Sequence, residues 1–115
     1  MITKNLSELI KSYISDDQIR LVICERRFGA VIELNLINLE GKKSWWITQL
    51  RVDPNTTKKE KLASYILKEA IKIVYKKYPA QIYVSSSNWG VFLEHQKDFY
   101  LNNSFVRKGS YFVCG

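Results

Sequence analysis

The residues whose chemistry stands out lie in one short stretch, between an apolar strand and a long helix. Three lysines, Lys58, Lys59 and Lys61, fall within four positions directly after the turn at 53–57. A helix begins with N–H groups that have no acceptor inside the helix and with a partial positive charge, so this end favours bound anions. The types and the spacing of these residues predict an anion-binding site between Leu50 and Ala63.

The distribution of charge points to the same part of the chain. The formal net charge is +7, and the segment from Lys42 to Tyr78 holds ten basic residues against three acidic ones, which is the whole excess. An excess of this kind predicts an anionic partner, either a phosphorylated cofactor at the turn or a nucleic acid along the helix. The alternative for Lys68, Lys72 and Lys76 is a solvated helix face that only keeps the protein soluble.

Other classes of protein are disfavoured by composition. The two cysteines, Cys24 and Cys114, lack metal-ligand spacing and His95 is the only histidine, so we expect no metal site. No apolar run approaches the ~18 residues of a membrane span, and the N-terminus lacks the pattern of a signal peptide. We therefore predict a cytoplasmic protein without membrane contact, formed by one domain over residues 1–115.

The first half of the chain predicts a helix and an antiparallel meander of three strands. Apolar residues recur at helical spacing from Leu6 to Ile14, which predicts a short amphipathic helix. From Ile19 to Arg26 the period falls to two, and a second alternating strand follows the turn at 27–29. The turn at 40–42 then leads into a third strand, Trp45 to Val52.

The second half predicts a parallel βαβ unit. A long helix follows the third strand, Tyr78-Pro79 ends it, and a new strand runs from Ile82 to Ser85. A last helix is predicted from Val91 to Asn102, and a terminal strand from Ser110 to Val113. The fold class is therefore α/β with a mixed sheet. The apolar stripe of the long helix consists of Leu62, Ala63, Ile66, Leu67, Ala70, Ile73 and Val74.

Two motifs in this order of elements resemble the GNAT superfamily of N-acetyltransferases. The run from Leu50 to Pro54 (LRVDP) is similar to the family's strand that ends in Val-x-Pro. The run from Phe99 to Phe105 (FYLNNSF) is similar to its Phe-Tyr followed by Gly-Phe, with Ser104 in place of the glycine. The resemblance covers the chain from Leu6 onwards and implies a GNAT-like fold whose two parallel strands splay apart.

The resemblance also implies a cofactor and its contacts. Such proteins bind acetyl-coenzyme A in the gap between the splayed strands, where backbone groups of Leu50, Arg51 and Val52 would pair with the pantetheine arm. The helix start would hold the pyrophosphate, and a residue after the next strand would contact the cofactor. The residues implied are Thr57, Lys58, Lys59, Lys61, Leu62, Ala63 and Asn88.

Acyl transfer needs an amine without its extra proton and a proton donor for the departing thiolate. The resemblance places Tyr100 as that donor; the alternative is that Tyr100 packs with Phe99 under the sheet. Many members carry a glutamate as general base on the strand before the turn, where this chain has Thr48. Glu33 on the neighbouring strand is the expected substitute.

The phosphate loop departs from the family pattern. It contains no glycine, Lys58 stands at the position of the usual Arg or Gln, and Lys61 stands at the first glycine. The residues from Thr57 to Glu60 also have the spacing of a capping box, whose side chains would occupy the N–H groups that a pyrophosphate needs. The three lysines would then supply the positive charge from side chains instead of backbone.

The tryptophans and the last strand end each have two interpretations. Trp45, Trp46 and Trp89 either stack on nucleic-acid bases or, for the adjacent pair, cover opposite faces of the sheet. Asn88, with the serines before it, contacts the cofactor or caps the last helix.

The predicted function is a small N-acyltransferase that moves an acetyl group from acetyl-coenzyme A to a primary amine on a small molecule or a protein. The alternative is a catalytically inactive GNAT-like module that binds a protein or nucleic-acid partner through its basic, aromatic surface. A homodimer is compatible with both.

Overall fold

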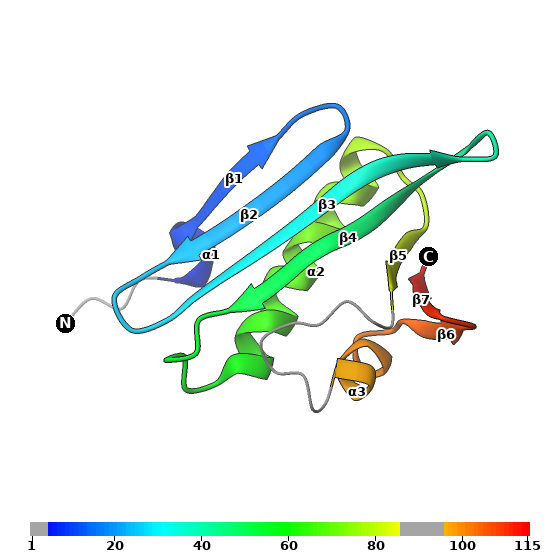
Figure 1. The fold of residues 1–115 in the computed structure, drawn as a ribbon. Coiled ribbons are helices and arrows are strands. Elements are labelled where there is room, and N and C mark those ends of the chain that lie inside the picture. The colour runs from blue at the N-terminus through cyan, green and yellow to red at the C-terminus, as the bar shows by residue number, and fades with distance from the viewer. Residues whose placement is uncertain (1–4, 86–95) are drawn as a thin grey trace.

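The computed structural model describes residues 5–85 and 96–115, which form a mixed α+β fold with one seven-strand sheet and one main helix, α2 (Figure 1). The sheet is mostly antiparallel and contains one parallel pair, β4–β5. The elements are α1 (Leu6–Leu9), β1 (Ile10–Ile14), β2 (Gln18–Cys24), β3 (Gly29–Leu39), β4 (Lys42–Val52), α2 (Lys59–Lys77), β5 (Ile82–Ser85), α3 (Gln96–Asn102), β6 (Val106–Lys108) and β7 (Tyr111–Cys114).

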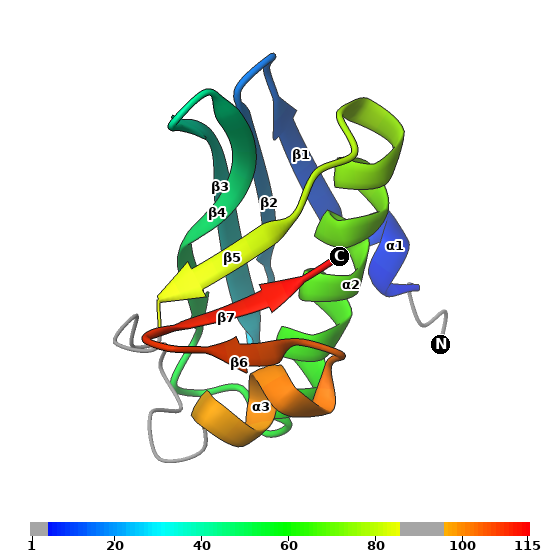
Figure 2. The same ribbon diagram turned by 90° about the vertical axis from the view of Figure 1, so that its right-hand side faces the viewer.

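The strands lie in the order β1-β2-β3-β4-β5-β7-β6. Helix α2 lies behind the sheet in Figure 1, and the turned view in Figure 2 shows α1 and α2 on the same side. The strands from β2 to β4 bury alternate residues against α2, as their period of two requires. The core therefore sits between α2 and one face of the sheet.

The prediction of a helix from Leu6 to Ile14 is wrong. Helix α1 ends at Leu9, and residues from Ile10 form β1, which pairs with β2 along its whole length from Ile10↔Ile23 to Ile14↔Ile19. As a consequence the antiparallel meander has four strands instead of three. Pairing with β2 satisfies the backbone of β1, even though Tyr13 and Ile14 remain 57% and 48% exposed.

The meander turns where the sequence predicts. The β2–β3 connection is closed by the Glu25 N–H donating to Phe28 O, at 3.0 Å. Glu40 and Gly41 connect β3 to β4 with φ values of 52° and 82°, the left-handed backbone that suits a two-residue hairpin turn. The predicted strand pairs and turn positions of this part are thus present, with an added strand at the edge.

Strand β4 changes neighbour and register within its length. It pairs with β3 from Lys42 to Val52, and the register shifts by one residue between Glu33 and Leu34, opposite Thr48. On its other side it pairs with β5 only through Trp45↔Ile82 and Trp46↔Tyr83. The parallel ladder therefore ends directly before the irregularity in β4, and this geometry gives the two strands room to separate.

Helix α2 packs on the sheet through the predicted stripe. Leu62, Ala63, Ile66, Leu67, Ala70 and Val74 are buried, and Ile73 is partly buried against the same core. The end of α2 is attached to β4, because the Trp45 indole N–H donates to Tyr78 O at 2.9 Å. Trp45 itself is fully buried.

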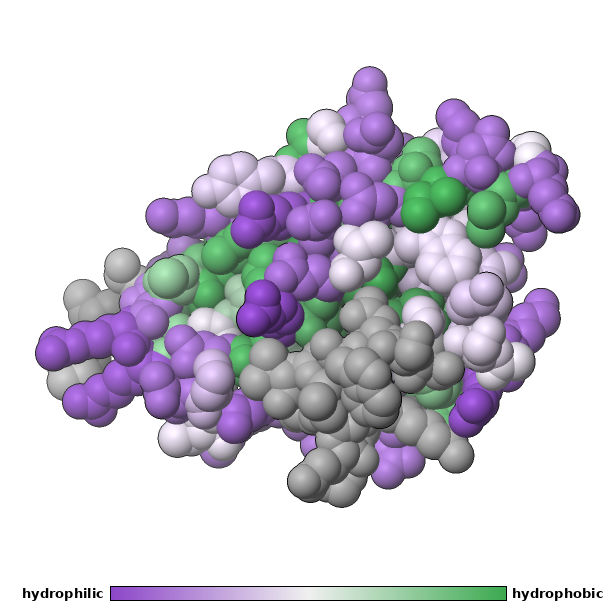
Figure 3. Space-filling view, in the orientation of Figure 1, coloured by the Kyte–Doolittle hydropathy of each residue, from purple (hydrophilic) through white to green (hydrophobic). Residues whose placement is uncertain are grey.

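The two adjacent tryptophans cover opposite faces, as one of the two interpretations predicted. Trp46 lies on the outer face, stacked on Tyr83 at a centroid distance of 5.1 Å and edge-on to Tyr111 at 5.2 Å. Figure 3 shows this side of the molecule, where hydrophobic areas alternate with hydrophilic residues. The pair therefore serves sheet packing, with Trp45 inside and Trp46 outside.

The C-terminal part ends in a hairpin with one strand more than predicted. Strands β6 and β7 pair antiparallel, and β7 pairs with β5 from Ile82↔Cys114 to Ser85↔Tyr111. The last predicted helix is α3, described from Gln96 to Asn102; the segment 86–95 before it lies outside the described residues. Strand β6 was not predicted because its three residues are all exposed and have no apolar alternation.

Candidate functional site

The loop between β4 and α2 is fixed by local hydrogen bonds. After Asp53-Pro54, the Asn55 N–H donates to Asp53 Oδ1 at 2.8 Å, and the Thr56 N–H donates to Asp53 O at 2.9 Å. Thr56 then turns inward, 7% exposed, and its Oγ1 accepts from the Gly29 N–H at 3.2 Å. This bond ties the loop to the first residue of β3 and so fixes where α2 begins.

The predicted capping box is absent from the described structure. The N-cap residue is Lys58, not Thr57, and no side chain among the described residues caps the helix. The Leu62 N–H donates to Lys58 O at 3.1 Å, so Leu62 is the residue that begins the ladder of α2. Because Thr56 is held inside, the helix starts one residue later than the capping pattern requires. The N–H groups of its first turn are therefore open to an external acceptor.

Most of the residues predicted for the phosphate site come together around this helix start. A hollow of about 550 Å³ is lined by Thr57, Lys58, Lys59, Glu60, Lys61 and Ser64. Three lysines and one glutamate line it, and the positive end of the α2 dipole adds to the positive charge. This arrangement suits a multiply charged anion such as a pyrophosphate.

Leu62 and Ala63 take a different place from the lysines. Their side chains are 6% and 0% exposed and face the sheet, so only their backbone is near the helix start. In β4, Leu50 and Val52 are likewise buried, whereas Arg51 is exposed. These three residues pair with Ile32, Val31 and Ala30 of β3, and their other backbone edge has no strand partner among the described residues.

Glu33 lies in a polar cluster on the outer face, next to the irregularity in β4. Its Oε1 accepts from the Gln18 Nε2, the Asn35 Nδ2 and the Thr48 Oγ1, at 3.4, 3.3 and 3.4 Å. Thr48 also donates to Glu33 O at 3.3 Å and accepts from Asn35 at 2.8 Å. The carboxylate predicted as a base thus reaches the side chain at the position where the family carries its glutamate.

Tyr100 is in the core. It is 2% exposed and stacks on Phe112 at 5.6 Å, with Phe99 and Phe105 edge-on at 5.1 and 5.3 Å. Burial raises the pKa of its hydroxyl well above the ordinary value of a tyrosine. A hydroxyl of this kind stays protonated and is able to donate, but the surrounding rings give it the environment of a core residue.

Some residues at the site carry no signal in the sequence. Asn103 follows α3, and its Nδ2 donates to Ser64 Oγ at 3.1 Å and to Phe99 O at 2.8 Å. Ser64 in turn lines the hollow at the helix start, so this contact joins α3 to the candidate site. Thr56 is the other residue that the sequence does not single out. A threonine before a helix suggests a helix cap, whereas its hydroxyl accepts from the Gly29 N–H.

Asn88, Trp89 and His95 lie outside the described residues. Among residues 5–85 and 96–115, no three His, Cys, Asp or Glu side chains are grouped as metal ligands. Within the same residues, no helix has the length and the apolar character needed to cross a membrane. Comparisons of this chain with protein-family models, with curated proteins and with solved structures find no match.

Proposed function

We propose that this chain is a small GNAT-like N-acyltransferase that binds acetyl-coenzyme A and acetylates a primary amine. The observation that carries the proposal is the geometry between β4 and α2. The parallel pairing of β4 with β5 ends after two residue pairs, and β4 then leads to a helix start without a side-chain cap, among three lysines. The pantetheine arm would lie along β4, and the pyrophosphate would lie at Lys58, Lys59 and Lys61.

The end of α3 supports the resemblance at a second point. Ser104 has a φ of 70°, the left-handed backbone for which the family's motif uses glycine. The Phe105 N–H donates to Tyr100 O at 3.1 Å, and the two rings are in contact at 5.3 Å, which is a Schellman helix end with its apolar contact. Ser104, which stands where the family's motif has glycine, therefore adopts a backbone conformation that favours glycine.

In the proposed reaction, the amine nitrogen attacks the thioester carbonyl carbon, a C–N bond forms, and the C–S bond breaks to leave a thiolate. The amine proton goes to a base and the thiolate takes a proton from a donor. Glu33 is the proposed base, because its carboxylate lies 3.4 Å from Thr48 Oγ1, next to the register shift between β3 and β4. Tyr100 is the proposed donor, because the resemblance places it there and burial keeps its hydroxyl protonated.

A second candidate is a non-catalytic module that uses the basic helix start to bind an anionic protein or a nucleic acid. The burial of Tyr100 favours this second candidate, because Tyr100 is only 2% exposed and is therefore not accessible to a thiolate in the empty protein. The three side-chain hydrogen bonds to Glu33 favour it as well, since they already occupy Oε1 with donors from the protein itself.

Calorimetry with acetyl-coenzyme A tests the proposal. The cofactor should bind, and at 100 times its dissociation constant it should stabilise the protein by roughly 2.7 kcal/mol in a thermal melt. Lys58→Gln with Lys61→Gln should weaken binding at low salt. The matched control, Lys68→Gln with Lys76→Gln, has the same charge on the same helix and should bind nearly as well as the native chain.

Glu60→Gln adds a test of direction. It removes the one negative charge of the hollow and should tighten cofactor binding at low ionic strength. Turnover is followed as free thiol released in the presence of a panel of primary amines. No binding at millimolar acetyl-coenzyme A would reject the enzyme, and binding without any thiol release would favour the non-catalytic module.

A further inference from the structure

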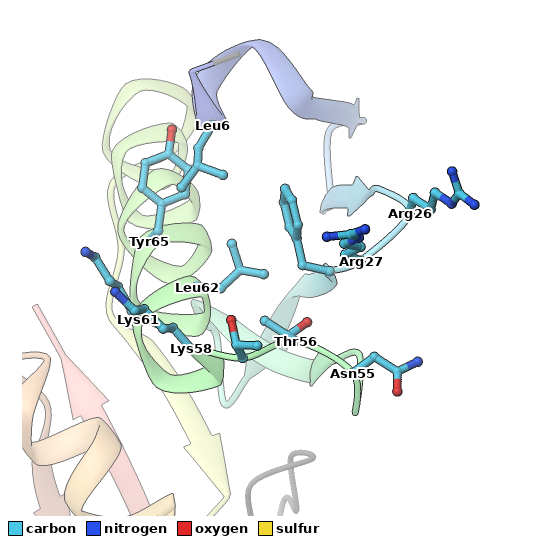
Figure 4. Close-up of a pocket in the computed structure, with 11 residues that line it drawn as sticks. Leu6, Arg26, Arg27, Asn55, Thr56, Lys58, Lys61, Leu62 and Tyr65 are labelled. Atoms are coloured by element: carbon cyan, nitrogen blue, oxygen red, sulfur yellow. The ribbon is translucent and has the colours of Figure 1, made fainter. Parts of the chain in front are cut away.

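A second hollow adjoins the helix start on the side of the β2–β3 turn, and it shares Thr57, Lys58 and Lys61 with the hollow described above. It has a volume of about 760 Å³ and lies between α1, the β2–β3 turn and the start of α2 (Figure 4). Its apolar walls come from Leu6, Phe28, Leu62 and Tyr65. These residues belong to three separate parts of the chain, so the hollow exists only in the folded protein.

The rim of this hollow is cationic. Arg26 and Arg27 of the β2–β3 turn lie on one side, and Lys58 and Lys61 of the helix start lie on the other, with the charged ends of Arg26, Lys58 and Lys61 directed outward in Figure 4. All four side chains are exposed, and no Asp or Glu is among the lining residues. Exposed side chains of this length change rotamer within nanoseconds, so their charged ends can move over a bound group.

The inner part of the hollow offers few polar contacts. Leu62 points between α2 and the β2–β3 turn, and Tyr65 and Leu6 close the upper end (Figure 4). Thr56 lines the hollow too, but its Oγ1 already accepts from the Gly29 N–H. A nucleobase needs hydrogen-bond partners for its edges, whereas an aliphatic chain needs only apolar walls.

We propose that this hollow binds an amphipathic anion, a small molecule with an aliphatic chain between Leu62 and Phe28 and a phosphate or carboxylate head at the arginines and lysines. Charge complementarity selects the head, because four basic residues line the hollow and no Asp or Glu does. The apolar walls select the body. This site shares Lys58 and Lys61 with the proposed pyrophosphate site, whereas Arg26 and Arg27 belong to it alone.

Octyl phosphate, used below its micelle concentration, is the probe. It should bind in calorimetry, and inorganic phosphate and octanol should each bind at least 10-fold more weakly. Affinity should rise along the series of butyl, hexyl and octyl phosphate, by up to ~4-fold for each methylene that becomes buried. Amide shifts in NMR spectra should concentrate at 26–28 and 56–62.

Charge variants locate the site. Arg26→Gln with Arg27→Gln should weaken octyl phosphate binding by ~5-fold or more at low salt. The control, Lys59→Gln with Lys68→Gln, removes the same charge from positions that do not line this hollow and should change affinity less than 2-fold. Acetyl-coenzyme A binding should show the opposite pattern: it should weaken in Lys59→Gln with Lys68→Gln and stay nearly unchanged in Arg26→Gln with Arg27→Gln. This difference separates a failure of this site from a failure of the proposed function.

Four results would overturn the inference. The first is that octyl phosphate does not bind to the folded native chain at millimolar concentration. The second is that octanol binds with the same affinity as octyl phosphate. An affinity that does not depend on chain length would leave a bare anion site. Adenosine monophosphate that binds more tightly than octyl phosphate would replace the aliphatic body with a nucleotide.

Discussion

Replacing Thr56 with valine removes one hydroxyl from the interior and keeps the branched shape of the side chain. The lost atom is the acceptor for the Gly29 N–H, 3.2 Å away, and both residues are buried. A buried N–H without a partner costs about 1 to 3 kcal/mol of the free energy of unfolding. For a chain of this size the Tm should fall by roughly 4 to 15 °C.

The measurement is a pair of reversible melts or urea titrations, with Thr57→Val as the control. Thr57 is exposed, and no hydrogen bond of its side chain is found in the described structure, so Thr57→Val should stay within about 0.5 kcal/mol of the native chain. A larger loss of stability in Thr57→Val than in Thr56→Val would contradict this prediction. That result would restore Thr57 as the helix cap and would leave the Thr56 hydroxyl without a structural role.

Three further substitutions test other parts of the structure. Ser104→Gly should stabilise the protein by about 1 kcal/mol in a urea titration, because φ is 70° and glycine avoids the cost of a left-handed backbone. Tyr100→Phe keeps the ring packing, so it should change Tm little and, if Tyr100 is the donor, lower thiol release ~100-fold. Glu33→Gln should leave cofactor affinity unchanged and, if Glu33 is the base, lower thiol release by a similar factor.

Each of these has a contrary outcome. Asn102→Gly, placed before the helix end, should destabilise by about 0.5 to 1 kcal/mol, and a gain there equal to that of Ser104→Gly would remove the argument from φ. A drop in Tm for Tyr100→Phe with normal thiol release would make Tyr100 a core residue only. Full turnover in Glu33→Gln would transfer the role of base to another group or to water.

The elements that pack on the core were predictable from the sequence. The stripe of α2 follows the helical period from Leu62 to Val74, and the strands around Ile32 and Trp45 alternate between buried and more exposed residues. Each of these segments contains its own signal, since the pattern of apolar residues reflects the face it buries. The parallel pairing of β5 with β4 also followed from the βαβ connection.

The N-terminal segment shows where such a pattern fails. Ile10 and Ile14 are four residues apart, a spacing that places two residues on one face of a helix and also on one face of a strand. What decides is the partner, because β2 offers a free edge to the backbone of residues 10–14. A partner that lies elsewhere in the chain is not visible in a local window.

The prediction of a capping box at the start of α2 fails for a related reason. The spacing of Thr57 and Glu60 is sufficient for a capping box, but the structure uses the preceding threonine for a contact with Gly29, 27 residues away in the chain. That long-range bond moves the helix start to Lys59. The lysines were predictable as a cluster, whereas the openness of the N–H groups beside them was not.

The sheet has its shortest backbone pairing inside it, between β4 and β5. Strands β1 to β4 and α2 form one body, fastened by Thr56 at the start of the helix and by Trp45 at its end. Strands β5, β7 and β6 form the other, and only two residue pairs join it to β4, against four between β5 and β7. The stack of Trp46 on Tyr83 bridges this junction at 5.1 Å. The two aromatic rings therefore add packing contacts on the outer face to the junction where the backbone pairing is shortest.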